Sequence, residues 1–280
     1  LKCQRIFEVN CLSQYRDSIK INLGAFIYMK IEILPVVAYT VAILIPFKAT
    51  AMSEQKYNPV VFNMAQMYDF NPVKGNVKEV KSTIYNEDNS INYISNLKIG
   101  RDGCIDEFSL SQVKDEYINS IHNELFVKRV KDKLIGEDIN GPVEMEIGKD
   151  CLVLSKKDSN GKLLYEYNDD GFIKGSMIKS PNIKLNEYHY DKDNRLYAIT
   201  YYSENKVFSE TVVEYDKDPA KPYDVLLEVK VMNQSALIAD TKCEYDKRGV
   251  SYKCNFVLTL TPNGKTIKLN KRSTTEVIFY

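Results

Sequence analysis

The sequence predicts a mainly β protein: an antiparallel meander of hairpins that folds into a roll or sandwich, with one short helix. Short runs alternate apolar and polar residues with period two, as in Leu227, Val229 and Val231, which is typical of half-buried strands. Clusters of Asn, Asp and Gly separate the runs, and these residues supply the positive φ that tight hairpin turns require. The clusters lie in residues 84–91, 97–103, 159–162, 167–171, 190–194, 245–249 and 262–265.

An apolar segment after Met29 predicts a secretory signal peptide over residues 29–51. Residues 33–47 are fifteen residues without a charge, fewer than the roughly 20 that a membrane-spanning helix needs. Lys30 provides the basic start of a signal, and Ala49 and Ala51 form a small-x-small cleavage site. We therefore expect the mature chain to begin at Met52. The alternatives are a buried core strand and an uncleaved membrane anchor.

Residues 1–28 are interpreted as an over-extended gene prediction upstream of the signal, because a signal peptide acts at the N-terminus. A genuine cytoplasmic extension is the alternative. Residues 52–280 are enough for one large domain or two small ones, and we expect a single mature, mainly β domain. Without the six basic and three acidic residues of the first 51, 32 basic and 35 acidic residues remain. This balance argues against nucleic-acid binding, which needs a clustered basic surface.

Four cysteines after the signal predict two structural disulfides in an oxidising compartment. If Arg248 and Gly249 form a two-residue turn, Tyr245 faces Tyr252 and Cys243 lies directly opposite Cys254. The spacing therefore favours a Cys243–Cys254 bridge and leaves Cys104 to pair with Cys151. A zinc site is the rival interpretation, but it needs cysteines at close paired spacing, and none of these four lies in a CxxC motif.

A degenerate repeat runs through the predicted hairpins. Each copy begins with Tyr or Cys, has Tyr two residues later, Asn or Asp directly after that Tyr, and Gly or Asn three residues further on. Three full copies lie at residues 165–171, 188–194 and 243–249, and a shortened copy lies at 213–216. The frame resembles the YD-type repeats of bacterial surface proteins, and we interpret each copy as a hairpin, because an Asx residue bonds its own turn. One segment has helical spacing instead, through Val113, Tyr117, Ile118 and Ile121, and predicts a helix near residues 111–122.

The sequence motifs that could indicate a metal site or a phosphate-binding loop are incomplete. His122 and His189 are the two histidines of the chain, and neither lies in a pattern of Cys or carboxylate residues that makes a metal site. The tripeptide Gly264-Lys265-Thr266 mimics the end of a phosphate-binding loop but lacks the Gly five residues earlier. The sequence thus predicts no catalytic residue, no cofactor and no metal.

Several segments resemble the YnfC-like family of enterobacterial envelope lipoproteins, in order from about residue 59 to the C-terminus. They are residues 68–78 (Tyr-Asp-Phe-Asn-Pro-Val-Lys-Gly-Asn-Val-Lys), residues 102–106 (Asp-Gly-Cys-Ile-Asp), Met232-Asn233-Gln234, residues 242–246 (Lys-Cys-Glu-Tyr-Asp) with Cys254, and residues 275–280. The resemblance implies an envelope protein of uncharacterised function and carries over no catalytic residue. One departure matters: no cysteine lies between Met29 and Gly103, so the residue that would carry a lipid is missing.

We therefore expect an exported, soluble periplasmic protein that touches the membrane only through its signal or, alternatively, through an uncleaved anchor. The first hypothesis is a non-enzymatic envelope protein that binds or scaffolds an unidentified partner or ligand through an aromatic-rich sheet face. It predicts a tyrosine-lined surface. A hydrolase of the cell wall or of a secreted substrate is the second, and it needs His122 or paired carboxylates in a cleft. The third is an accessory partner of a YD-repeat surface protein.

Overall fold

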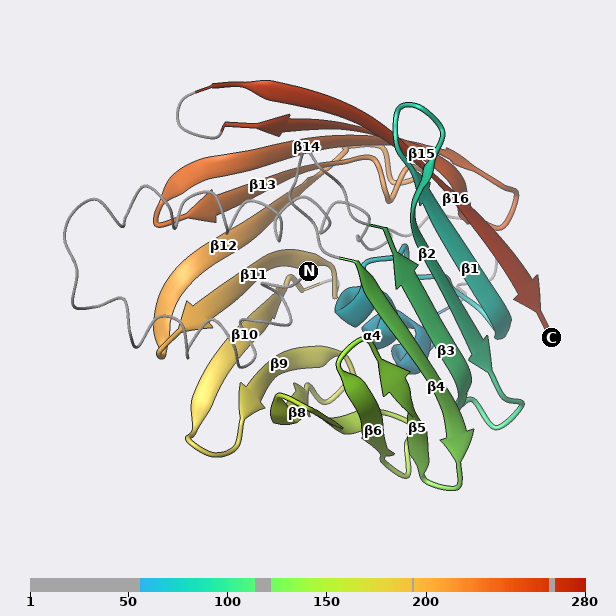
Figure 1. The fold of residues 1–280 in the computed structure, drawn as a ribbon. Coiled ribbons are helices and arrows are strands. Elements are labelled where there is room, and N and C mark those ends of the chain that lie inside the picture. The colour runs from blue at the N-terminus through green and yellow to red at the C-terminus, as the bar shows by residue number, and fades with distance from the viewer. Residues whose placement is uncertain (1–55, 114–121, 193, 262–264) are drawn as a thin grey trace.

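The computed structural model describes residues 56–113, 122–192, 194–261 and 265–280. The predicted extension at 1–28, the signal peptide at 29–51 and its cleavage residues Ala49 and Ala51 lie outside these ranges. Within them the chain is mainly antiparallel β with one helix, as the sequence predicts (Figure 1).

Sixteen strands form one closed barrel in which each strand pairs with its neighbours in sequence and β1 pairs with β16. The strands are β1 Val77–Tyr85, β2 Ile91–Ile99, β3 Ile105–Gln112, β4 Asn123–Val130, β5 Lys133–Asp138, β6 Gly141–Ile147, β7 Val153–Asp158, β8 Gly161–Tyr167, β9 Ile173–Ile178, β10 Ile183–Tyr190, β11 Leu196–Ser203, β12 Lys206–Tyr215, β13 Val225–Val231, β14 Gln234–Tyr245, β15 Ser251–Leu260 and β16 Ile267–Phe279.

The predicted mainly β, antiparallel hairpin meander with one helix is confirmed, and its architecture is a closed barrel, which is more specific than the predicted roll or sandwich. The difference lies in the pairing of the first strand with the last, which runs from Val77 opposite Phe279 to Tyr85 opposite Arg272. This pairing satisfies the backbone N–H and C=O groups that an open sheet would expose at its two edges.

The alternation of side chains decides which residues face the interior. On β14, Leu237, Ala239 and Thr241 are buried, whereas Ile238 and Asp240 between them are exposed. Paired residues of neighbouring strands share a face, so the inner wall continues through the facing positions of β13 and β15. The period-two runs that predicted these strands thus form the inner wall of the barrel.

The helix α4, Pro59–Tyr68, lies inside the barrel (Figure 1). The Asn58 side chain caps it by accepting a hydrogen bond from the backbone N–H of Val60, and Pro59 occupies its first turn. Its residues are buried on nearly every side, which is the pattern of a helix surrounded by protein. At ten residues, this helix of the described chain is too short and not apolar enough to cross a membrane.

The predicted helix near residues 111–122 is wrong at its start, because Ser111 and Gln112 belong to β3. Residues 114–121 lie outside the described residues, and Leu125, which continues the helical spacing, is an inward residue of β4.

Contacts from α4 and the segment after it brace three parts of the wall. Asn63 donates from Nδ2 to the carbonyl of Gly171 at 2.8 Å and accepts from the N–H of Ile173 at 2.8 Å. The ring of Tyr68 packs on Phe108 of β3, with centroids 4.5 Å apart. Further on, Asn71 donates to the Ser251 hydroxyl of β15 at 2.9 Å. The helix is therefore fixed within the barrel at several points.

The repeat copies occupy the β8–β9, β10–β11 and β14–β15 turns, all at the same end of the barrel. In the first, the N–H of Asn168 donates to Phe172 O at 2.9 Å, and the Asn168 side chain accepts from the N–H of Phe172 at 2.9 Å. The Tyr before each Asx also has a role. Tyr190 and Tyr215 donate their hydroxyl protons to the carbonyls of Ile173 and Leu196, which begin β9 and β11, each at 2.8 Å. The repeat therefore stabilises this end of the barrel, which we call the repeat end.

Two disulfides join Cys104 to Cys151 and Cys243 to Cys254. The first links the β2–β3 turn to the β6–β7 turn, and the second joins directly opposed residues of β14 and β15. The turn beyond the second bridge differs from the predicted two-residue turn. A bulge after Glu244 places Tyr245 opposite Ser251, not Tyr252, because Asp246 bonds the N–H groups of Arg248 and Val250 within a longer turn.

Candidate functional site

Unpartnered polar side chains gather on the inner face of the barrel. Each has a buried side-chain oxygen or nitrogen that forms no hydrogen bond, and the set consists of Gln66, Asp69, Gln112, Ser176, Asn186, Tyr201, Thr211 and Thr241. Such groups are rare in folded proteins because an unmet buried donor or acceptor costs about 1–3 kcal/mol. Several of them within one interior indicate a place where other polar groups bind.

Asp69 is the charged member of this set. It ends α4 in the left-handed region, with φ 56°, and its backbone N–H bonds the carbonyl of Ala65. Only 1% of the residue is exposed, and both carboxylate oxygens are without a hydrogen-bond partner. Burial raises the pKa of Asp69 from 3.8 to about 8. No basic side chain of the described residues forms an ion pair with it.

Tyr201 and Thr211 lie on the wall of the barrel, on β11 and β12. Thr211 pairs with Ile199, and Ser209 pairs with Tyr201, so Tyr201 and Thr211 are diagonal neighbours on the inner face of β11 and β12. Burial raises the pKa of Tyr201, the nearby Asp69 charge raises it further, and the Thr211 hydroxyl lowers it. The hydroxyl oxygens of Tyr201 and Thr211 form no hydrogen bond within the structure.

Gln66 lies one helical turn before Asp69, and it is equally buried, at 1% exposure. Its amide nitrogen and oxygen both lack partners. Gln66, Asp69, Tyr201 and Thr211 offer an amide, a carboxylate and two hydroxyls, all of which accept hydrogen bonds. The remaining inner wall on β13, β14 and β15 is largely apolar, with Leu227, Val229, Leu237, Ala239, Leu258 and Leu260 all buried.

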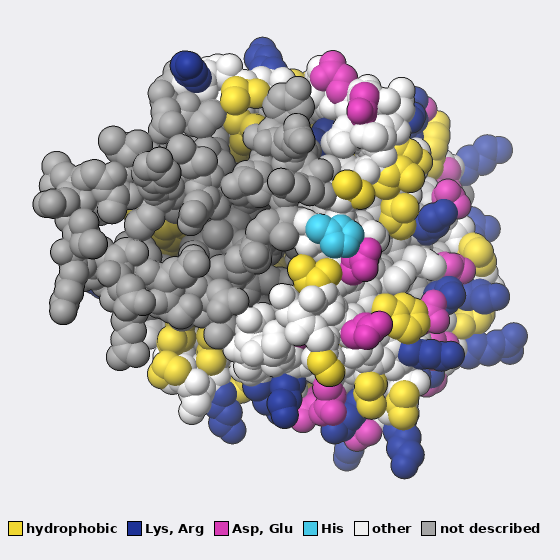
Figure 2. Space-filling view, viewed as in Figure 1, with side chains coloured by type: hydrophobic (Ala, Val, Ile, Leu, Met, Phe, Trp, Pro, Cys, Tyr) yellow, Lys and Arg dark blue, Asp and Glu magenta, His cyan; other side chains and the backbone are white. Residues whose placement is uncertain are grey.

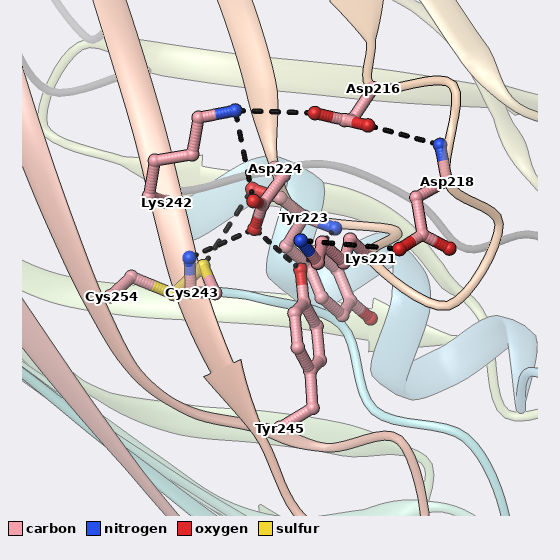
Figure 3. Close-up of polar contacts among 9 residues, drawn as sticks. All are labelled: Asp216, Asp218, Lys221, Tyr223, Asp224, Lys242, Cys243, Tyr245 and Cys254. Carbon is pink, nitrogen blue, oxygen red and sulfur yellow. Dashed lines mark hydrogen bonds and ion pairs between the residues drawn. A yellow bond between two sulfur atoms is a disulfide. The ribbon is translucent and has the colours of Figure 1, made fainter.

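A second polar group of residues lies at the repeat end, around the second disulfide (Figure 3). Asp224 accepts from the N–H of Cys243 at 2.9 Å and from the Tyr245 hydroxyl at 3.1 Å, and Lys242 lies 3.7 Å away. Lys242 also reaches Asp216 at 3.3 Å. The hydroxyl of Tyr223 donates to the carbonyl of Pro72, which follows α4. Because these groups satisfy one another, this cluster fastens the β12–β13 loop and is not an open site.

The histidines lie apart from any such cluster. His122 is exposed, with its Nε2 3.1 Å from Glu124 Oε1 in an open surface pair. His189 is hydrogen-bonded to Thr200 at 2.9 Å and packs beside Tyr197, with ring centroids 6.1 Å apart. His122 therefore lies on the exposed surface and not in the cleft that the hydrolase hypothesis expects. Across the described residues no three His, Cys, Asp or Glu side chains converge to hold a metal.

The predicted tyrosine-lined surface is also wrong. Most described tyrosines are buried or half-buried, and several donate to strand carbonyls at the repeat end. The visible outer face carries interspersed Lys, Arg, Asp and Glu with scattered single hydrophobics (Figure 2). Gln66 and Asp69, which are buried inside the barrel, are not among the residues that the sequence motifs single out. Asn58-Pro59 is a helix-start signal that could have placed α4 and, with it, Gln66 and Asp69.

Comparisons with known proteins were made by sequence and by structure. A sequence model of "Uncharacterised protein family (UPF0257)" matches residues 29–280. The UPF0257 lipoprotein YnfC of Escherichia coli is 23% identical over 202 residues, which cover 72% of this chain and 80% of the relative, and the figures for the Shigella flexneri protein are the same. A porin-like protein from Bacteroides uniformis aligns with 73% of this chain and 98% of its own, at 9% identity and a TM-score of 0.36.

Proposed function

Since this chain belongs to the uncharacterised protein family UPF0257, whose matched relatives are named lipoproteins, we propose that it is an exported cell-envelope protein that binds a ligand inside its barrel and catalyses no reaction. The two disulfides support export, because such bonds persist in oxidising compartments. The family and the disulfides together favour the periplasmic side of the envelope.

The observation that carries the proposal is the set of unpartnered polar groups on a largely apolar inner wall. A barrel of about eight strands is filled by its own side chains, whereas wider barrels enclose a lumen that holds ligands or plugs. Sixteen strands surround α4 here. Polar groups of a bound ligand would meet the buried side-chain groups that lack partners.

Fluorescence titration with the apolar probe N-phenyl-1-naphthylamine tests this function. We expect saturable binding that Ala239→Phe weakens, because Ala239 is fully buried on the inner wall and a larger side chain there narrows the lumen. The matched control is Ile238→Phe, one residue away but exposed on the outer face, which should leave binding unchanged. Absence of saturable binding, or equal loss in both variants, would overturn the proposal.

A further inference from the structure

Closure of the barrel leaves part of one strand without a neighbour. β16 pairs with β15 from Ile267 onward, but its pairing with β1 ends where Tyr85 lies opposite Arg272. Residues 267–271 therefore extend beyond β1, as the start of β16 does in Figure 1. Within the described chain, no strand pairs with this side of residues 267–270. We call residues 267–271 the free edge of β16.

The β1–β2 turn lies beside the free edge and contacts it through side chains. Asn86 Oδ1 accepts from Lys271 Nζ at 3.1 Å, and Glu87 Oε1 accepts from Asn270 Nδ2 at 3.2 Å. The backbone of the turn bonds within itself, since the N–H of Asn86 donates to the carbonyl of Ser90 at 2.9 Å. The turn therefore does not continue the ladder, and alternate backbone N–H and C=O groups of the free edge point away from β15. Such groups can pair with an added strand.

Side chains give the two faces of the free edge different chemistry. On the outer face, Lys268 and Asn270 are exposed, and Lys268 pairs with Thr259 of β15. On the inner face, Ile267 and Leu269 are half-buried, although the neighbouring inward residues of β15 are buried. An added strand would cover the exposed part of these two apolar side chains.

Positive charge is concentrated along this part of β16. Residues 265–272 include four basic residues and no acidic one. Within the described chain, neither Lys268 nor Arg272 forms an ion pair. The Cζ atom of Arg272 lies 4.4 Å from the centroid of the Tyr85 ring, and its buried Nε has no hydrogen-bond partner. Cations that lack a partner favour an acidic binding partner.

A second copy of this chain would fit the free edge poorly. Antiparallel pairing of two free edges would bring Lys268 and its basic neighbours against the same residues of the other copy, where like charges repel. Lysines on an exposed edge oppose such self-pairing. The occupant that fits the charge is therefore an acidic segment of another protein.

An added strand would have to match both faces of the free edge. Paired residues share a face, so side chains opposite Lys268 lie outward and those opposite Ile267 and Leu269 lie inward. We propose that the free edge of β16 binds an extended segment of a partner protein in which acidic residues alternate with apolar ones. Backbone hydrogen bonds to the edge supply affinity, and Lys268 and Arg272 select the acidic side chains. This surface is separate from the barrel interior and does not depend on ligand binding there.

Fluorescence anisotropy with labelled peptides tests the proposal on the purified protein. The probe is fluorescein-labelled Glu-Val-Glu-Val-Glu-Val, used below the concentration at which it self-associates, and we expect saturable binding. Lys-Val-Lys-Val-Lys-Val should bind at least about tenfold more weakly, because its charges repel those of the edge. Absence of saturable binding by the acidic peptide, or equal binding of the two peptides, would overturn the proposal.

Backbone methylation separates strand pairing from simple charge attraction. The acidic peptide is methylated either at its Glu nitrogens or at its Val nitrogens, and in a paired strand one of these sets faces β16 and the other faces solvent. One methylated peptide should therefore lose at least about tenfold in affinity and the other should bind nearly as well as the parent. Equal affinity of the two methylated peptides would overturn edge pairing.

Lys268→Glu tests the position of the site. We expect it to weaken binding of the acidic peptide at least about tenfold, because it replaces an attractive charge by a repulsive one. Lys128→Glu is the matched control: Lys128 is exposed on β4, where it pairs with both Glu107 and Ile135, and the change should leave binding unaltered. Equal loss in the two variants would contradict the assignment. So would binding of the peptide to the unaltered protein without slower amide exchange in residues 267–270.

Discussion

At the scale of single residues, the buried polar side chains inside the barrel differ in whether they have a hydrogen-bond partner. Asn63 and Asn71 satisfy their side chains against the wall, and these bonds hold the helix. Asp69, three residues beyond Gln66 and six beyond Asn63, receives no such partner from the described residues. The contrast between residues on the same short segment separates a structural role from a binding role.

The buried carboxyl of Asp69 makes folding stability depend on pH. Its pKa is about 8 in the folded protein and 3.8 as the ordinary value, so the folded state holds the proton more tightly. The contribution of Asp69 to stability therefore falls as pH rises from about 4 to 8, by up to about 1.4 kcal/mol per pH unit, and is constant above 8. Relative to the wild type, Asp69→Asn should gain stability as pH increases through this window.

Urea unfolding of both proteins at pH 5, 6, 7, 8 and 9 checks this expectation, since other titrating groups cancel in the difference. A stability difference that does not change between pH 5 and 8 would contradict the protonated, buried state of Asp69. Asp240→Asn provides the exposed comparison and should show little pH-dependent difference.

At the scale of elements, the strands follow from local pattern, whereas the helix does not. Leu227, Val229 and Val231 alternate with polar residues, and their inward placement could be predicted because such a strand has one buried face and one solvent-exposed face. α4 is buried nearly all round and so carries no polar stripe for periodicity to detect. The helical spacing from Val113 onward predicts a helix that begins near residue 111. The strand β3 continues through Gln112 instead, because Gln112 pairs with residues of both β2 and β4.

Asn63 is the residue on which the position of α4 depends most. Its removal in Asn63→Ala leaves the carbonyl of Gly171 and the N–H of Ile173 without partners in a buried region. We expect a loss of about 2–4 kcal/mol in the free energy of unfolding, from two buried backbone groups left unsatisfied. Urea denaturation measures it, and Asn255→Ala on the exposed side of β15 should change stability by less than about 0.5 kcal/mol. Equal effects would show that the helix is not held in this way.

At the scale of the whole molecule, closure is the feature that sequence patterns could not supply. Each hairpin is specified locally by its turn, as in the Asn168 and Asp246 turns. The pairing of β1 with β16 joins residues nearly 200 positions apart, such as Val80 with Val277, and no local signal encodes it. The pairing of Cys243 with Cys254 could be predicted from the sequence because both residues belong to one hairpin. The surroundings of Asp69 could not be predicted, because they form only when the barrel closes.

The two disulfides should stabilise the barrel unequally. In the chain-entropy description, a bridge contributes more when it closes a longer loop. The sequence separations are 47 residues for Cys104–Cys151 and 11 for Cys243–Cys254. We expect the Cys104→Ala/Cys151→Ala pair to lose about 4 kcal/mol and the Cys243→Ala/Cys254→Ala pair about 3 kcal/mol. Unfolding of the two double variants under oxidising conditions measures the order, and a clearly larger loss for the shorter loop would contradict it.

Ligand binding within the barrel is the central claim, and photoaffinity mapping tests it most directly. The purified protein is irradiated with a diazirine-bearing analogue of N-phenyl-1-naphthylamine, and labelled residues are located by peptide mass spectrometry. Because inward and outward residues alternate along β14, the strand contains its own control. Label on Leu237, Ala239 and the facing residues of β15, abolished by excess N-phenyl-1-naphthylamine, is the predicted result. Label on Ile238, Asp240 and other outward residues, or label that excess N-phenyl-1-naphthylamine does not reduce, would contradict binding inside the barrel.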